Sequence, residues 1–566
     1  MKKILCFTAI LMTTGFLFLG CSKAVSPSGG TARTGAKGSL PLTSERATLT
    51  AYMAGNFEGV SSTSYSDNLF TKKVADETGV LVDFISSSNG TMEKMNVMLS
   101  AGDYPDLVMF YGMDQSTMNY WADQGIFIAL DDYDLMSYPN IREALTKYPK
   151  FDTVIKAGDG KIHCLPTLNE SQHLAASYGR IWTYMPWSMQ NGRKVPQTLD
   201  EMTAFLRQIK NDDWNKNSKK DEIGIAFNKG DIRNFVSFFA NSFMPFVGGG
   251  SYFGIALDNK KVVEQYKDPQ FRETLKYLAG LYREGLILEN AFDISGEQLK
   301  SLAMNADPLI GFISVAWITS YVENMSERMA EFIPLAPLKG PRGVQYQAWD
   351  DWDGYMRQYF VTDKCKDPEL AVALYDYFIR RDVTLDCLYG VGNWAKSDPG
   401  TKSMTGGTPE YKTIGSALYV GGPQNIGWGQ GAIPMIRSAE WIYGGHQADG
   451  FDNTIQWILN ADPAVKDEVV SNIDYMETAY VYTAEQFKKY AIPQNIVLPP
   501  LMINNADMTR IADIDAVLRD YINTSIVEFI IGEKNISSDP DWNAYLSQLD
   551  AIGSKEKISI LQKYIE

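Results

Sequence analysis

One ten-residue segment, DWNKNSKKDE from Asp213 to Glu222, has residue types and spacing suited to binding a cation. Oxygen-bearing side chains stand at its positions 1, 3, 5 and 9, as in the first nine residues of an EF-hand loop. A tight turn with this spacing aims alternate side chains at one hard cation, and the lysine at position 7 would offer its backbone carbonyl. The pattern therefore favours a calcium-binding loop.

Two departures from the EF-hand pattern keep another interpretation open. Ser218 occupies position 6, where an EF-hand needs glycine, and the acid Glu222 comes at position 10 rather than 12. A solvated polar turn would have a similar composition, because three lysines stand among the acidic residues. The residues alone leave a calcium loop and a polar surface turn as alternatives.

Signatures of common metal and hydrolytic enzymes are missing from the sequence. The three histidines, His163, His173 and His446, are too far apart for a two-histidine zinc motif, and no Cys-x-x-Cys, His-Glu-x-x-His or Gly-x-Ser-x-Gly occurs. The 566 residues include 52 basic and 68 acidic side chains, which argues against a nucleic-acid partner. The length and the 45% hydrophobic content predict a globular protein of two or more structural units.

The N-terminus has the layout of a secretory signal peptide. Lys2 and Lys3 precede an apolar run over residues 4–19, which is short for a membrane span. The run ends in LFLGC, which resembles a bacterial lipoprotein signal with Cys21 as the lipidated residue, although Phe18 stands where leucine is usual. We expect residues 1–20 to be removed and residues 21–44 to form a flexible tether. The protein would then be exported and held at the bacterial membrane by its lipid alone, with plain secretion as the alternative.

Strand and helix signals alternate in the first folded part of the chain. Residues 47–53, 80–85 and 106–110 have strand character, and the helical stretches 68–78 and 91–101 lie between them. This βαβαβ order predicts a parallel sheet with helices on both faces.

A second α/β pattern follows, and helices then dominate the last third. Residues 180–185 and 224–227 are strand-like, Thr198 with Glu201 forms a capping box for a helix, and residues 308–314 would return the chain to the first sheet. The expected C-terminal helices span residues 369–381, 463–479, 483–490, 513–531, 542–549 and 555–564.

Four strings, in this order behind the signal, resemble one family over nearly the whole mature chain. They are SAGDYPDLV at residues 100–108, YREGLI at 282–287, PLAPLKGP at 334–341 and DWNAY at 541–545. Together they resemble the extracellular solute-binding proteins of bacterial ABC transporters, in particular the large oligosaccharide-binding lipoproteins similar to the LplA and alginate-binding proteins. The resemblance implies a monomeric protein that captures an oligosaccharide and passes it to an ABC permease.

The resemblance also implies a fold and a set of metal ligands. The fold would be a two-lobed α/β, periplasmic-binding-protein-like fold with a hinge, an interlobe cleft and a helix-rich C-terminal part. Residues 45–165 with about 308–365 would form the first lobe, residues 166–307 with about 366–500 the second, and residues 501–566 C-terminal helices packed on the lobes. Hinge crossings are expected near residues 165–168, 307–311 and Cys365. Alginate-binding-like proteins carry a calcium loop of the same spacing, so the resemblance implies these structural Ca²⁺ ligands: Asp213, Asn215, Asn217, Lys219 through its carbonyl, Asp221 and Glu222.

Aromatic residues fit a carbohydrate ligand on physical grounds. A sugar ring has apolar C–H faces and a rim of hydroxyls, so a binder needs aromatic platforms beside hydrogen-bonding groups. Many of the 12 tryptophans stand beside polar or glycine-rich sequence. The candidate ligand-binding residues are Trp182, Trp187, Trp352 and Trp394, with Asp350, Asp351, Asp353 and Arg357 as hydrogen-bonding partners.

An exported glycosidase or polysaccharide lyase is the rival class, because it would share the signal, the aromatic residues and the acidic composition. Asp350, Asp351 and Asp353 supply carboxylates of the kind that a glycosidase needs. The sequence leaves the acidic or neutral character of the ligand open. It also leaves open whether Cys365 and Cys387 pair, with buried thiols as the simpler expectation.

Overall fold

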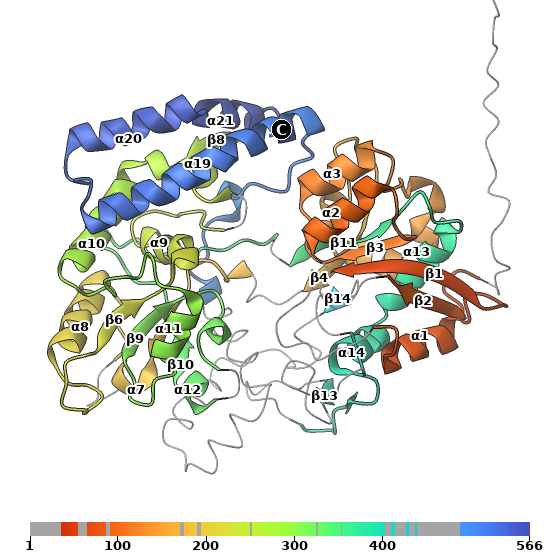
Figure 1. Ribbon diagram of the computed structural model, residues 1–566, viewed down its shortest axis with the longest axis horizontal. Coiled ribbons are helices and arrows are strands. Elements are labelled where there is room, and N and C mark those ends of the chain that lie inside the picture. Colours follow the sequence, from red (N-terminus) through yellow and green to blue (C-terminus); the bar gives the residue numbers. More distant parts are fainter. Residues whose placement is uncertain are drawn as a thin grey trace, which may run out of the picture.

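The computed structural model (Figure 1) describes most of the chain. The described residues are 36–54, 65–85, 91–169, 175–188, 194–249, 252–323, 326–352, 354–401, 408, 410–413, 426–428, 436–437 and 487–565. They form two α/β lobes side by side, and the C-terminal helices lie over the lobe that holds the middle of the sequence (Figure 1).

The first lobe is built on a mixed sheet that, in the described part of the chain, has six strands in the order β14-β4-β11-β3-β1-β2. Strand β1 runs parallel to β2 and β3, whereas β11 runs antiparallel to both β3 and β4. The strands are β1 Ala47–Ala54, β2 Val80–Phe84, β3 Leu107–Phe110, β4 Leu165–Asn169, β11 Tyr355–Val361 and β14 Ile436–Arg437.

Helices cover both faces of this sheet, as the βαβαβ pattern predicts. Side chains of a strand alternate between faces, so Ala51 and Met53 of β1 join one hydrophobic core and Tyr52 joins the other. Asn68 caps the first helix by accepting the Phe70 N–H at 2.9 Å, and Gly79 ends that helix at φ 76°. The helices of this lobe are α1 Leu69–Thr78, α2 Met92–Ala101, α3 Gln115–Asp123, α4 Pro139–Lys147, α5 Phe151–Val154, α13 Pro368–Phe378 and α14 Arg381–Tyr389. A small pair, β12 Trp394–Lys396 and β13 Tyr411–Thr413, lies beside α14.

The second lobe has a smaller sheet, in the order β10-β5-β9-β6 among the described strands. The predicted capping box forms, because Thr198 accepts the Glu201 N–H at 3.1 Å and the Glu201 carboxylate accepts the Thr198 N–H at 3.2 Å. The strands are β5 Ile181–Tyr184, β6 Ile223–Ala226, β9 Ile310–Ser314 and β10 Phe332–Pro334, with a hairpin of β7 Ile255–Asp258 and β8 Lys261–Glu264. The helices are α7 Met185–Ser188, α8 Leu199–Asn211, α9 Ile232–Ala240, α10 Pro269–Arg283, α11 Gly296–Ala303 and α12 Glu327–Ala330.

Three C-terminal helices complete the second lobe. They are α19 Asn505–Ile531, α20 Asp539–Ile552 and α21 Ser554–Gln562. Their apolar residues belong to the same core as β5, β9 and α10, and the buried Lys557 ammonium donates to Asp515 at 2.6 Å to join α21 to α19. The predicted helices 513–531, 542–549 and 555–564 are present, whereas those at 463–479 and most of 483–490 lie outside the described residues.

The predicted division of residues between the lobes is wrong in two places. Strands β9 and β10 pair with β5 and β6 in the second lobe, so residues 308–334 do not return to the first sheet. Helices α13 and α14 pack in the first lobe, so residues 366–389 do not belong to the second, whereas β11 lies in the first lobe as predicted. The physical reason is that both sheets bury apolar strands, and composition does not say which sheet a strand joins.

Three segments connect the lobes near one small apolar cluster. The first follows β4 and leads to β5, the second joins β10 to β11, and the third leads into α19. Ala175, Trp349 and Val497, one from each segment, lie in the same buried cluster. The predicted crossing near residues 165–168 adjoins the first segment, whereas residues 307–311 lead into β9 inside the second lobe and Cys365 lies in the first-lobe core.

Cys164, Cys365 and Cys387 are buried thiols in this structure, which confirms the simpler expectation for these three cysteines. None of the helices in the described ranges is long and apolar enough to cross a membrane.

Candidate ligand-binding site

The candidate site lies at the carboxyl edge of the first-lobe sheet. Because β11 is antiparallel to both β3 and β4, these two strands and β1 all end at the same edge, where β11 begins. In open α/β sheets, ligands bind outside the carboxyl ends of the strands. The groups found there include Asn169 at the end of β4, Tyr355 and Arg357 at the start of β11, and Gln115 after β3.

At this edge, the ammonium group of one lysine lies against two aromatic rings. The Lys150 ammonium lies 4.8 Å from the centroid of the Trp352 ring and 5.6 Å from that of Tyr355, and it donates to the Asp351 carbonyl at 2.9 Å. Burial lowers the pKa of Lys150, and the nearby Asp350 and Asp351 carboxylates oppose that shift. Both rings are partly exposed, which leaves aromatic surface for a ligand.

The carboxylates of the 350–351 pair have separate partners. Asp350 accepts the Trp352 N–H at 2.9 Å, and burial raises the pKa of its carboxyl group. Asp351 accepts the Trp349 indole N–H at 2.8 Å. Both acids therefore hold the second interlobe segment in place while they border the aromatic pair. Asp353 lies outside the described residues.

Arg357 sits deeper at the same edge. Its guanidinium donates to the Gln115 side chain, and burial lowers its pKa despite the neighbouring Asp114 carboxylate. The Nε atom is buried and has no hydrogen-bond partner among the residues that the structure describes. Such a donor costs free energy unless a ligand or water satisfies it.

Asn169 is a second unsatisfied group. The residue is 6% exposed, and within the described part of the chain neither its Oδ1 nor its Nδ2 atom has a hydrogen-bond partner. The residues predicted from the sequence did not include Asn169, Lys150, Gln115 or Tyr355. For Asn169 alone, its position in the sequence could have revealed it. It is the last residue of a short, largely apolar strand, and ligands of such sheets bind at the carboxyl ends of the strands.

The second lobe contributes Arg180 and Trp317 close to the interlobe segments. The Arg180 guanidinium lies 5.7 Å from the Trp317 ring centroid and donates to the carbonyls of Ala316 at 2.8 Å and Ala176 at 3.2 Å. Trp317 follows the carboxyl end of β9 and is partly exposed. Its partly exposed ring therefore lies close to the first interlobe segment.

Asp231 lies at the corresponding edge of the second sheet, after β6. It accepts the Tyr321 hydroxyl at 2.5 Å, and burial raises the pKa of its carboxyl group to about 6. This acid therefore changes its charge near neutral pH.

The structure separates the predicted tryptophans. Trp352 lies at the sheet edge with Asp350, Asp351 and Arg357, whereas Trp182 and Trp187 are 2% and 3% exposed in the second-lobe core. The Trp182 indole donates to the Val315 carbonyl at 3.0 Å, so its polar atom is also satisfied internally. Burial contradicts a platform role for these two residues, because large aromatics near polar sequence are often core residues. Trp394 packs instead on Tyr411 and donates to Asp386 at 2.8 Å.

The predicted calcium loop forms a compact turn between α8 and β6. Asp213 accepts backbone N–H groups from Asn217 at 3.1 Å and Ser218 at 2.9 Å, and Glu222 Oε1 accepts those of Trp214 and Asn215 at 2.5 and 3.1 Å. Lys216 and Ser218 take positive φ values of 61° and 67°, so Ser218 adopts the backbone that glycine usually supplies.

The oxygen atoms of this loop include one that could accept a metal ion. The Glu222 Oε2 atom is buried and finds no hydrogen-bond partner in the described ranges, and the Asn215 and Asn217 amides both donate to Asp221 at 3.2 Å. Among the described residues, no three His, Cys, Asp or Glu side chains form a metal-holding group by themselves. Amide and carbonyl oxygens would have to complete the set, which suits a hard cation. Cys21, the predicted lipidation site, lies outside the described residues.

Comparison with known proteins gives consistent matches. The family model for bacterial extracellular solute-binding proteins matches residues 70–396. The fructooligosaccharide ABC transporter substrate-binding protein FusA of Streptococcus pneumoniae is 24% identical over 508 residues, which cover 88% of this chain and 87% of that protein.

Two solved structures share the fold. The FusA EF-hand mutant of S. pneumoniae in complex with fructo-nystose has a TM-score of 0.66 at 20% identity, covering 92% of this chain and 99% of that one. The alginate-binding protein AlgQ2 without calcium ion has a TM-score of 0.61 at 18% identity, covering 92% and 98%.

Proposed function

This chain belongs to the bacterial extracellular solute-binding protein family, and on that premise we propose that it captures an oligosaccharide between its lobes for an ABC importer. The observation that carries the proposal is the sheet edge where the Trp352 and Tyr355 rings lie beside Asp350, Asp351 and the unsatisfied Asn169 amide. Aromatic faces next to hydrogen-bonding groups are what a sugar ring requires. Its relative FusA is a fructooligosaccharide-binding transporter component, which supports the same ligand class.

The proposed mechanism is hinge closure. A ligand that contacts both lobes stabilises the closed form in proportion to its differential affinity for that form. The first-lobe edge provides Trp352 and Asn169, and the second lobe provides Trp317 next to the same interlobe segments. The closed monomer is then the shape that a permease recognises.

Calorimetry and thermal unfolding of the mature protein with a panel of oligosaccharides test this function. A ligand at 100 times its Kd should raise the free energy of unfolding by about 2.7 kcal/mol. Product analysis of the same mixtures addresses the rival enzyme class: we expect stoichiometric retention and no shortened sugars. Turnover of any bound oligosaccharide would overturn the binding-protein assignment.

We also propose that the 213–222 loop holds a structural Ca²⁺. The ligands would be Asp213, Asn215, Asn217, the Lys219 carbonyl, Asp221 and Glu222, and the buried Glu222 Oε2 atom supports the fit because it lacks a partner. One of the solved structures is of an EF-hand mutant of FusA, and an EF-hand in this relative supports the same assignment. A bound cation would tie the end of α8 to the start of β6.

Calcium titration of chelator-treated protein tests this site. We expect binding heat and a higher Tm, both lost in Asp213→Asn and Glu222→Gln. Asp200→Asn is the matched control, because Asp200 lies in the first turn of α8, at the opposite end of that helix from the loop. Equal calcium response in all variants would exclude the loop.

Finally, we propose that export ends with lipidation of Cys21. Radiolabelled fatty acid should enter the wild-type protein in its bacterial host, and Cys21→Ser should yield unlabelled protein. Label in the Cys21→Ser variant would contradict the assignment.

A further inference from the structure

We infer that a groove between helices α2, α3 and α19 is a second binding site, which takes a mono- or disaccharide. The groove has a volume of about 450 Å³, within the range of roughly 300–1,000 Å³ that is usual for small-molecule sites. The described residues that line it include none of the sheet-edge residues named above, so this site is separate from the one in the proposed function.

The groove has walls from both lobes. A different face of α19 carries Ile511, Ile514 and Leu518 into the second-lobe core, whereas α2 and α3 belong to the first lobe (Figure 1). Residues four apart on a helix share one face, and each of the three helices turns such a pair toward the groove. The pairs are Asn96 and Ser100 on α2, Ser116 and Tyr120 on α3, and Thr509 and Asp513 on α19. A ligand in the groove would therefore touch helices of both lobes.

Tyr120 offers the groove an aromatic platform. The residue is 52% exposed, and its ring packs edge-on against the Trp121 ring, with 4.7 Å between the centroids and 78° between the planes. The Trp121 indole donates to the Asn96 Oδ1 atom at 3.0 Å, and this bond joins the aromatic pair to α2. A ring that is braced on one side and open to solvent can take the apolar C–H face of a sugar.

Hydrogen-bonding groups on α2 and α19 complete the site. The Asp513 carboxylate has two acceptor oxygens, which suit two neighbouring hydroxyl groups of a sugar. The Ser100 and Thr509 hydroxyls can each donate and accept. The Asn96 Nδ2 group can donate, while its Oδ1 atom accepts from Trp121. An aromatic face beside a few donors and acceptors is the combination that a polyhydroxyl ligand requires.

Saturation-transfer NMR with sucrose, lactose and maltose tests the groove. The measurements use the mature Trp352→Ala protein, which is expected to bind less sugar at the sheet edge. We expect at least one disaccharide to bind with a Kd that is unchanged by Val517→Trp and is weakened at least ~10-fold by Thr509→Trp. Thr509 lines the groove, whereas Val517 is exposed on the same helix and is not among the lining residues. Because both positions are exposed, both variants should keep the Tm of their parent.

Three results would overturn the groove site. They are equal sugar affinity in the two tryptophan variants, no signal from any of the three sugars, and signals from putrescine alone, which would indicate a site for cations. Each of them leaves the proposed function standing, because that function is tested on the wild-type protein and depends on the sheet edge.

Variants of Tyr120 test the platform itself. Tyr120→Phe keeps the ring and should keep the affinity for the disaccharide, whereas Tyr120→Ser removes the ring and should weaken binding ~10-fold. The same NMR titration measures both variants in the Trp352→Ala protein. Equal binding by the phenylalanine and serine variants would contradict the role of the ring.

Discussion

At the scale of single residues, burial decides which predicted side chains can serve a ligand. Trp352 keeps exposed ring surface beside Lys150, whereas Trp182 and Trp187 fill the second-lobe core. All three were predicted from residue type, which does not distinguish a core tryptophan from an exposed one. Position relative to the strand ends does.

Replacement of the ring at the sheet edge should separate binding from packing. Trp352→Ala is expected to weaken oligosaccharide binding by ~10-fold or more, because it removes an aromatic platform from the site. Trp394→Ala is the matched control, since that indole packs on Tyr411 and Asp386 instead. Calorimetry with one oligosaccharide measures both variants, and equal losses would argue against Trp352 as the platform.

Asp231 predicts a pH dependence of stability. Its pKa of about 6 in the folded protein lies above the ordinary value of 3.8, so the folded state holds the proton more tightly than the unfolded state. The associated stability is fully present below pH ~4 and is lost as the pH rises through about 6. Asp231→Asn keeps an acceptor for Tyr321 and should stabilise the protein at pH 7 by about 2 kcal/mol, with little change at pH 4. Denaturant unfolding at both pH values measures this; equal effects at pH 4 and 7 would refute it.

At the scale of elements, a side chain of one first-lobe helix caps the N-terminus of another. Helix α4 begins at Pro139 after Tyr138, which gives no side-chain cap. Asp376 of α13 takes that role, because its carboxylate accepts the N–H groups of Asn140 and Ile141 at 2.9 and 2.8 Å. The cap comes from a residue 236 positions away in sequence, so local patterns could not reveal it.

Loss of this remote cap should destabilise the first lobe. Asp376→Ala leaves the N–H groups of Asn140 and Ile141 and the Asn140 side-chain amide without their acceptor, and we expect it to lower the free energy of unfolding by about 2 kcal/mol. Asp382→Ala removes only a partly exposed pair with Arg380 and should cost less than about 1 kcal/mol. Urea unfolding compares the two, and an equal loss would show that the α4 cap contributes little.

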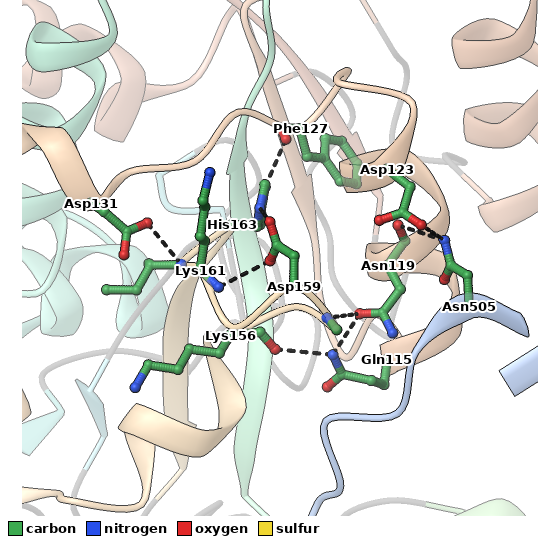
Figure 2. A network of polar contacts seen from close by, with 12 residues as sticks. Gln115, Asn119, Asp123, Phe127, Asp131, Lys156, Asp159, Lys161, His163 and Asn505 are labelled. Carbon is green, nitrogen blue, oxygen red and sulfur yellow. Dashed lines mark hydrogen bonds and ion pairs between the residues drawn. The ribbon is translucent and has the colours of Figure 1, made fainter. Parts of the chain in front are cut away.

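At the scale of the whole molecule, one buried amide clamps the third interlobe segment to the first lobe. Asn119 of α3 is 1% exposed; it donates to the Ile503 carbonyl at 2.7 Å and accepts from the Gly158 N–H at 2.9 Å. It also accepts from Gln115 Nε2 at 2.8 Å (Figure 2). Asn505, the first residue of α19, donates to Asp123 at the end of α3 (Figure 2). A Cβ atom on Gly158 would come within 2.8 Å of the Ile503 carbonyl oxygen, so the segments also fit closely.

Breaking the clamp should change the relation between the lobes. Asn119→Ala removes all three bonds, and we expect a loss of about 2–3 kcal/mol in unfolding free energy and a broader distribution of lobe separations. Small-angle scattering of the ligand-free protein measures the second effect. Gln124→Ala, at the exposed end of the same helix, serves as the control. A scattering profile identical to wild type would show that Asn119 does not restrain the hinge.

The sequence by itself determined the alternating strands and helices, the capping box of α8 and the helix-rich C-terminus, because periodicity and caps are local properties. It also placed Asp350, Asp351, Trp352 and Arg357 at one site, since they are neighbours in the chain. Only the tertiary structure decided which sheet β9 and β10 join, because strand pairing is a long-range choice between equally apolar partners. For the same reason it alone brought Asn169, Lys150 and Gln115 to the edge where these residues meet, since strand ends converge only once the sheet has formed.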